Sequence, residues 1–221
     1  MKRLIIILGL SGFYTIVNAQ VKDIQLWTGP TVKYNISKKI RLDFEQQFRF
    51  KENISTYNYT LSEFGLKYKL FEYLDLKATF RQSFLPSRNT GTEISDNNKS
   101  RVYLDASTGI KIFNTGIKAG YRFRYEHSWE NITLVPSDYL RNRFELDYNL
   151  SKLVDPYADW ESFFRLNRKN EFRQNRCRIG LNWNISKKLN IDSYYLYMKD
   201  INVKNPETNF IIGLQVEYSI N

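Results

Sequence analysis

Apolar and polar side chains alternate along much of this chain, and this period of two constrains the fold more than any other feature. It is clearest between residues 40 and 50, where Ile40, Leu42, Phe44, Phe48 and Phe50 oppose Arg41, Asp43, Glu45, Gln47 and Arg49. Successive side chains of a β-strand point to opposite faces, so one face of this strand is apolar and the other polar. No segment shows a convincing helical period. The sequence predicts an all-β protein.

Similar patterns recur along the rest of the chain. The regular strands cover about 74–84, 102–112, 117–126, 140–150 and 210–220, and the less regular ones about 24–36, 57–70, 157–167, 173–185 and 189–199. Each runs about 10–13 residues, which is enough to cross a bilayer at a tilt, whereas strands of soluble proteins are nearer to about 5–6. The strand lengths therefore favour a transmembrane barrel.

The connections between these strands alternate in length. Short turns are expected near 36–39, 71–73, 113–116, 151–156 and 185–188, and longer polar segments near 51–56, 85–100, 127–138, 168–172 and 200–207. Outer-membrane barrels have short turns at the periplasmic rim and long loops at the outer rim. The expected fold is an antiparallel up-and-down transmembrane β-barrel with short periplasmic turns and longer outer loops.

Counting each of these segments as one strand gives an odd number. Eleven segments result, whereas single-chain bacterial barrels have even numbers. Pro30 cannot donate a hydrogen bond to a neighbouring strand, so a break at Gly29-Pro30 would divide the first segment in two. We therefore predict twelve strands, with ten as the alternative.

The N-terminus has the three-part pattern of a signal peptide. Met1-Lys2-Arg3 is positively charged, residues 4–17 are largely apolar, and we expect cleavage after Ala19. The apolar stretch is shorter than the about 20 residues that a membrane-spanning helix needs. We expect residues 1–19 to be removed, and residues 20–221 to form a single β-barrel domain in the outer membrane of a Gram-negative bacterium.

Composition narrows the classes of function. The chain has 33 Lys and Arg residues against 23 Asp and Glu, a net charge of +10, or +8 once Lys2 and Arg3 leave with the signal peptide. The charges alternate with apolar residues along strands, which argues against nucleic-acid binding and suits a barrel facing anionic lipopolysaccharide. The single cysteine, Cys177, excludes an intramolecular disulfide. It is expected as a small apolar filler, with an exposed reactive thiol as the alternative.

The charged faces of the strands form the main candidate site. Pointing inward, they would make a lumen charge network of Arg41, Asp43, Glu45, Arg49, Arg81, Arg122, Arg124, Arg141, Arg143, Glu145, Asp147, Asp159, Glu161, Arg165, Arg176 and Arg178. Arginine pairs bidentately with carboxylates and stays charged when partly dehydrated, so we expect cross-strand ion pairs and a structural role. The alternative is a small anion-biased channel or transporter. A barrel of about 10–12 strands is much narrower than porins of about 16–18, which favours the structural role.

His127 is the only histidine, so any histidine-dependent chemistry must use it. It is expected at the start of a long loop, with Ser128 beside it and Glu130 near. A lipid-modifying hydrolase of the outer membrane would use a base of this kind to activate a hydroxyl. Adjacent residues of a strand face opposite sides, however. No glycine-rich phosphate loop, metal-ligand cluster or nucleophile elbow is present, so we expect no enzyme activity, no cofactor and no metal.

A soluble secreted β-barrel or sandwich is a further alternative. Its inner face would be apolar and its outer face polar, the reverse of the membrane arrangement, and alternation alone does not distinguish the two. Strand length, the difference between the two sets of connections, and an aromatic content of 16% favour the membrane barrel.

The sequence also resembles an uncharacterised Gram-negative family called domain of unknown function 2490. The resemblance rests on Leu26-Trp27, the SKKIRLDFEQQFRF strand, Gly120-Tyr121-Arg122, Arg141-Asn142-Arg143-Phe144-Glu145, Pro156-Tyr157, Glu161-Ser162-Phe163 and the QNRCRIGLNWNISKKLNIDSYY segment. It implies an outer-membrane barrel with no established activity and no catalytic residues. The partners expected of such a barrel are outer-membrane lipid, lipopolysaccharide and the outer-membrane assembly machinery.

Overall fold

The computed structural model describes residues 21–85, 88–89, 94–95, 98–130, 136–167 and 169–220. The predicted signal peptide, residues 1–19, lies outside the described residues. Among the described residues, no helix has the length and hydropathy needed to cross a membrane.

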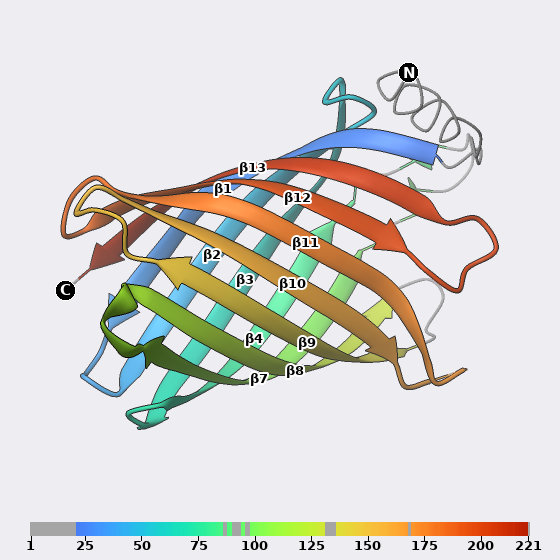
Figure 1. Ribbon diagram of the computed structural model, residues 1–221. Coiled ribbons are helices and arrows are strands. Elements are labelled where there is room, and N and C mark those ends of the chain that lie inside the picture. The colour runs from blue at the N-terminus through green and yellow to red at the C-terminus, as the bar shows by residue number, and fades with distance from the viewer. Residues whose placement is uncertain are drawn as a thin grey trace, which may run out of the picture.

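The described residues form one closed barrel of eleven strands (Figure 1). The barrel strands are β1 (Val21–Asn35), β2 (Ile40–Lys51), β3 (Thr56–Phe71), β4 (Leu74–Phe84), β7 (Lys99–Ile112), β8 (Ile117–Glu130), β9 (Ser137–Tyr148), β10 (Val154–Arg165), β11 (Glu171–Asn184), β12 (Leu189–Asp200) and β13 (Glu207–Ile220). The short strands β5 (Arg88–Asn89) and β6 (Ile94–Ser95) form a separate small sheet between β4 and β7, and the 3-10 turn η2 (Phe113–Thr115) follows β7.

The prediction of twelve strands, and the alternative of ten, are corrected to the eleven that the described residues form. β1 runs through Gly29 and Pro30 without a break because its pairing with β13 continues there, Gly29 opposite Gln215 and Pro30 opposite Val216. On the β2 side the ladder has no pairs at these two positions. The missing proline donor is therefore accommodated within one long strand.

An odd number of strands requires one parallel pair to close the barrel. β1 and β13 are that pair, whereas every other neighbouring pair of barrel strands is antiparallel. Val21 lies opposite Glu207, so β1 begins at the rim where β13 begins. Val21 and Ile220 therefore lie at opposite rims, as the blue and red ends of the ribbon show (Figure 1).

The connections differ between the two rims as the sequence predicts, although less strongly. One rim has residues 36–39, 72–73, 113–116, 149–153 and 185–188, and the other has 52–55, 85–98, 131–136, 166–170 and 201–206. The first connection of the second rim is as short as those opposite, and it turns through Glu52, Asn53 and Ile54 with positive φ angles. Thr56 Oγ1 donates a hydrogen bond to Glu52, and Lys51 forms an ion pair with it, which together lower the pKa of Glu52.

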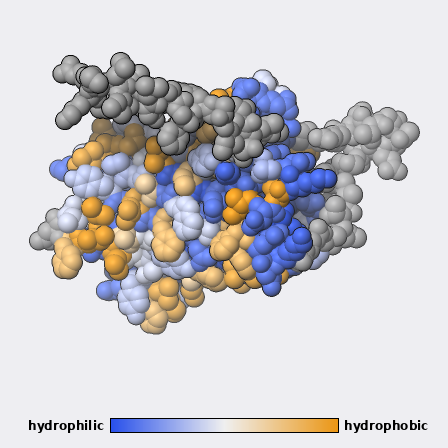
Figure 2. Space-filling view, turned by 45° about the vertical axis from the view of Figure 1, so that its right-hand side comes forward, coloured by the Kyte–Doolittle hydropathy of each residue, from blue (hydrophilic) through white to orange (hydrophobic). Residues whose placement is uncertain are grey.

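The outer wall of the barrel is apolar and the lumen is polar. Phe64, Ile110 and Ile179 point outward with 60–63% of their surface exposed. The buried side chains on the inner face are largely polar or charged, with Asp43, Arg49, Arg124, Glu126, Arg141 and Glu161 all at most 8% exposed. Figure 2 shows apolar side chains spread over the wall and hydrophilic ones gathered at the rim of the longer connections. This polarity is the reverse of that of a soluble barrel.

Candidate functional site in the lumen

Arginine and carboxylate side chains meet across neighbouring strands in the middle of the lumen. Arg141 on β9 bridges two carboxylates: its Nη1 donates to Glu126 Oε2 at 2.9 Å, and its Nη2 donates to Glu161 Oε2 at 2.9 Å. The β9–β10 register places Arg143 opposite Glu161 and Arg141 on the same face one pair away. Cross-strand and diagonal neighbours of this kind are within reach of long side chains.

Glu126 and Glu161 also contact further arginines. Arg122 Nη2 donates to Glu161 Oε1 at 2.6 Å, and Arg101 Nε lies 3.7 Å from Glu126 Oε1. The three guanidinium groups of Arg101, Arg122 and Arg141 therefore surround two carboxylates at this level, a local excess of positive charge.

Other arginines have a carboxylate of their own. Arg124 donates two hydrogen bonds to Asp105, at 2.6 and 2.7 Å, in the bidentate geometry that makes such pairs strong. Arg178 pairs with Asp159 at 2.6 Å, Arg41 with Asp43 at 2.7 Å, and Arg143 with Glu145 at 2.6 Å. Arg81 pairs with Glu63, and Lys77 adds a second cation beside Asp43.

Tyr103 lies at the centre of this network and has no exposed surface. The guanidinium carbons of Arg124, Arg81 and Arg141 lie 4.3, 5.1 and 5.9 Å from the centre of its ring, so cation–π attraction adds to the ion pairs. Tyr103 stands on the polar face of its strand, but the sequence alone does not mark it as a site residue. Glu63, Arg101, Asp105 and Glu126 are likewise network members outside the predicted set, and only the same alternation could have indicated them.

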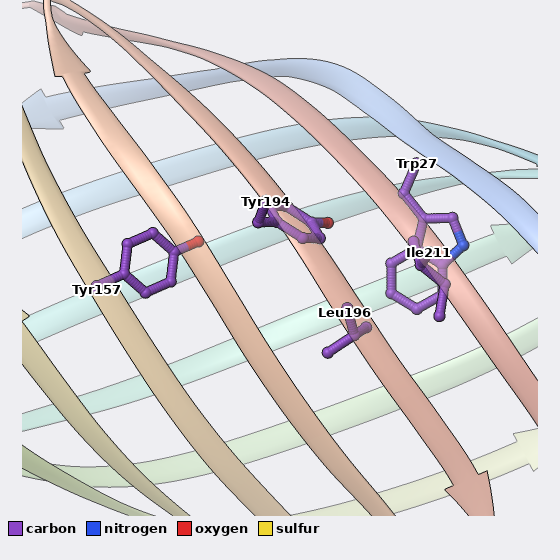
Figure 3. Packing of buried hydrophobic residues seen from close by; sticks show 5 residues of the cluster. All are labelled: Trp27, Tyr157, Tyr194, Leu196 and Ile211. Carbon is purple, nitrogen blue, oxygen red and sulfur yellow. The ribbon is translucent and has the colours of Figure 1, made fainter. Parts of the chain in front are cut away.

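The opposite side of the lumen is aromatic. Trp27, Tyr157, Tyr194, Leu196 and Ile211 are each at most 8% exposed and form one cluster that projects inward from β1, β10, β12 and β13 (Figure 3). Two glycines make room for the rings: a Cβ at Gly213 would lie 2.0 Å from the Tyr194 ring, and one at Gly180 would lie 2.5 Å from the Tyr157 ring.

Two arginines of the predicted set are held by rings and amides. Arg49 lies 3.5 Å above the Trp27 ring and donates to Gln47 at 2.6 Å and to Tyr59. Arg176 lies 4.4 Å above the Phe163 ring and donates to Gln174 at 3.1 Å.

Four predicted residues lie outside the central network. Glu45 accepts hydrogen bonds from Gln47 and Gln215. Arg165, the last residue of β10, is 3.4 Å from acceptors on Ser137 and Asn167 at the rim of the longer connections. Asp147 lines a cavity at the opposite rim, and Arg41 is the second residue of β2. Arg41, Asp147 and Arg165 therefore lie toward the ends of the lumen, whereas Glu45 lies in the middle of β2, opposite Glu63, without an ion pair of its own among the described residues.

Cavities enter the lumen from both ends, and one from each end reaches the buried centre of the network. The cavity at the rim of the longer connections measures about 280 Å³, and the one reaching toward the rim of the short turns about 270 Å³. Along β8, Arg124 lies between Glu126, which lines the first cavity, and Arg122, which lines the second. Along β9, Arg141 separates Tyr139 from Arg143 in the same way. The buried centre of the network therefore stands between the two cavities.

His127 and Ser128 do not form a site. Both belong to β8, which corrects the expectation of a loop histidine, because the strand continues to Glu130. His127 Nδ1 lies 2.6 Å from Asp138 Oδ1. Ser128 is 1% exposed, lines the outer cavity of the lumen and donates to the Ser137 carbonyl. Adjacent residues of a strand point to opposite faces, so the His127 imidazole and the Ser128 hydroxyl lie on different sides of β8.

Other chemistry is not evident at the described positions. Among the described residues, no group of three His, Cys, Asp or Glu side chains is arranged to hold a metal ion. Cys177 is exposed on β11, opposite Trp160 of β10, so it does not fill a core as the sequence suggested.

The architecture defines a β-barrel with an apolar outer wall and an ion-paired interior. The chain belongs to the family described as "Protein of unknown function (DUF2490)", which matches residues 24–209 and confirms the resemblance found in the sequence. The sequence has no match among curated proteins.

Solved structures with a similar chain path include outer-membrane proteins and a translocator domain. Outer-membrane expressed OmpT of Vibrio cholerae has 13% sequence identity and a TM-score of 0.41 over 73% of this chain and 54% of its own. The translocator domain of the autotransporter NalP from Neisseria meningitidis has 14% identity and a TM-score of 0.44 over 79% of this chain and 72% of its own. The chain thus spans about half the length of the OmpT structure.

Proposed function

We propose that this protein is an outer-membrane β-barrel of a Gram-negative bacterium, exported by its N-terminal signal peptide, whose lumen is closed by ion pairs and has a structural role. The observation behind this proposal is the polarity of the wall. Large apolar side chains cover the outside, while arginine–carboxylate pairs fill the inside. In water, the outer wall would expose a large apolar area, and the free-energy cost of that exposure is about 25 cal/mol per Å². A surrounding bilayer removes that cost.

Aromatic side chains near both strand ends support placement in a membrane. Exposed rings near the short turns include Tyr34, Tyr68, Phe71, Tyr73, Phe113, Tyr148 and Tyr218, and those near the other rim include Tyr57, Phe84 and Phe172. Aromatic rings favour the membrane interfaces and form two girdles on outer-membrane barrels. The partners in this proposal are outer-membrane lipid, lipopolysaccharide at the outer rim, and the machinery that inserts barrels.

The placement is tested by cell fractionation and gel mobility. The mature protein should sediment with the outer membrane, and unboiled samples should run faster on gels than boiled ones. Recovery in the soluble periplasmic fraction, with one mobility at all temperatures, would instead indicate a soluble barrel.

The sidedness of the barrel is tested with epitope tags. A tag inserted within 85–98 or 131–136 should be reached by antibody on intact cells, and one at Ser186 should not. The reverse pattern of labelling would invert the orientation.

The closed lumen is tested in planar bilayers. The unmodified protein should show little or no steady conductance, since buried, ion-paired side chains lie between the two cavities. A small anion channel is the competing function, favoured by the arginine excess around Glu126 and Glu161. A large, stable anion-selective conductance that Arg122→Gln or Arg143→Gln weakens would establish the channel.

A further inference from the structure

The outer cavity is framed by basic side chains from two strands, β7 and β11. Its lining includes Lys99, Arg101, Arg173 and Arg176, with Glu126 and Asp200 as the carboxylates. Lys99 and Arg173 are already paired, with Glu130 at 2.9 Å and Glu171 at 2.7 Å. The charges that remain to be explained are those of Arg101 and Arg176, on the floor of the cavity.

Arg176 is held without a carboxylate partner in the part of the chain that the structure describes. Among the described residues, no carboxylate oxygen lies within 4.0 Å of its guanidinium, and its one hydrogen-bond acceptor is Gln174. The group lies over the Phe163 ring and lines the cavity, and a guanidinium has five N–H donors, of which Gln174 takes one. A partly buried guanidinium needs acceptors, because an unpaired buried charge is costly.

Glu161 and Glu126, the carboxylates nearest to the cavity floor, accept hydrogen bonds from other arginines, and Asp200 accepts one from Gln174 Nε2 at 2.8 Å. Glu161 accepts three hydrogen bonds from Arg122 and Arg141. Glu126 accepts from Arg141, while Arg101 Nε at 3.7 Å is buried without a hydrogen-bond partner. The acceptors that this chain supplies are therefore fewer than the guanidinium donors around the cavity floor.

We propose that this cavity binds a small oxyanion, a carboxylate or a phosphate, with Arg176 as the principal ligand and Arg101 as the second. The planar guanidinium donates two parallel hydrogen bonds to two oxygens of one such group. The cavity volume of about 280 Å³ admits a small solute. Phe163, Tyr139 and Val203 supply apolar surface for the remainder of the molecule.

The connection between β12 and β13 forms part of the mouth of this site. Arg173 Nη1 donates to the Asn202 carbonyl at 2.8 Å, and Asn202 Nδ2 donates to the Phe172 carbonyl at 2.8 Å. These bonds hold residues 201–206 beside β11, so that Val203 closes one side of the cavity. The site is thus built before any ligand arrives.

The binding site goes beyond the proposed structural role, and rests on it only for the side of the membrane from which a ligand would enter. Calorimetric titration of the folded full-length chain in a zwitterionic detergent tests it directly. Inorganic phosphate and succinate are titrated separately, at constant ionic strength set with chloride. At least one should bind saturably, and the pair of titrations distinguishes phosphate from carboxylate as the preferred group.

Three variants complete the test. Arg176→Gln should weaken binding by about tenfold or more, because charge-assisted hydrogen bonds are lost. Arg176→Lys should weaken it less, since it keeps the charge without the planar fork. Arg41→Gln, at the other end of the lumen, should leave binding unchanged. Because no carboxylate of the described residues pairs with Arg176, its variants leave no such partner unpaired and should show the folded gel mobility.

Two outcomes would overturn the proposal. One is the absence of saturable binding of both anions to protein that shows the folded gel mobility. The other is binding that Arg176→Gln leaves intact. Neither outcome bears on membrane placement, which fractionation tests independently.

Discussion

The two sides of the lumen exclude water by different means. On the side of β7 to β10, arginines are held by carboxylates on neighbouring strands, as Arg141 is by Glu126 and Glu161. On the side of β12, β13 and β1, rings fill the space and arginines lie over them, as Arg49 lies over Trp27. A missing carboxylate leaves a buried charge unpaired, whereas a misplaced ring costs packing alone. The ion-paired side should therefore be the more sensitive to single substitutions.

The largest effect is expected for Glu161→Ala. The change leaves Arg122 and Arg141 with buried guanidinium groups that have lost their shared acceptor, at a cost of about 3–5 kcal/mol. The free energy of unfolding in urea, measured in lipid vesicles, should fall accordingly. Glu161→Gln keeps the shape and one acceptor oxygen and should lose less. A loss for Glu161→Ala no larger than that of an exposed pair would contradict the idea that this side depends on charge pairing.

Tyr103→Ala should lower stability by about 3 kcal/mol, as removal of a buried aromatic ring does, and should also connect the two cavities. A measurable conductance in planar bilayers is the expected second result, because the ring lies among the guanidiniums of Arg81, Arg124 and Arg141. Tyr139→Ala, in the outer cavity, is the matched control and should show no conductance. If neither variant conducts, the arginines close the lumen without the Tyr103 ring.

Gly213→Ala tests the aromatic side. Its new Cβ would lie 2.0 Å from the Tyr194 ring, so the ring must shift, and overpacking of this kind costs about 1–3 kcal/mol. Gly120→Ala is the control, since its Cβ would meet no atom closer than 3.6 Å. Urea unfolding of both variants should separate them by at least about 1 kcal/mol. Equal stability would mean that the ring moves freely and that the aromatic side is loosely packed.

Glu145→Ala should have the smallest effect. Glu145 pairs with Arg143 toward the rim of the short turns, where both side chains are about a quarter exposed, at 24% and 23%. Water can replace the lost partner there, so the expected loss is below about 1 kcal/mol. The same urea titration measures it beside Glu161→Ala. If the two losses are equal, burial does not set the strength of these pairs.

Several parts of the fold follow from the sequence. The alternation of Ile40 to Phe50 predicts a strand with one apolar and one polar face, and β2 spans Ile40–Lys51. Most of the turn positions agree to within a few residues, as at 36–39 and 185–188. The site is only partly predictable: Arg141 and Glu161 come from the polar faces, but Tyr103 looks like any tyrosine on such a face.

The alternation along each strand was determined by the sequence alone, because the face that a residue occupies depends only on its place in its own strand. The tertiary structure decided how those faces meet. Arg122 and Glu161 are 39 positions apart and contact each other only through the registers of β8, β9 and β10. The strand count depends on β1 closing against β13, with Val21 opposite Glu207. Pairing and closure are properties of the whole sheet, and no local pattern specifies them.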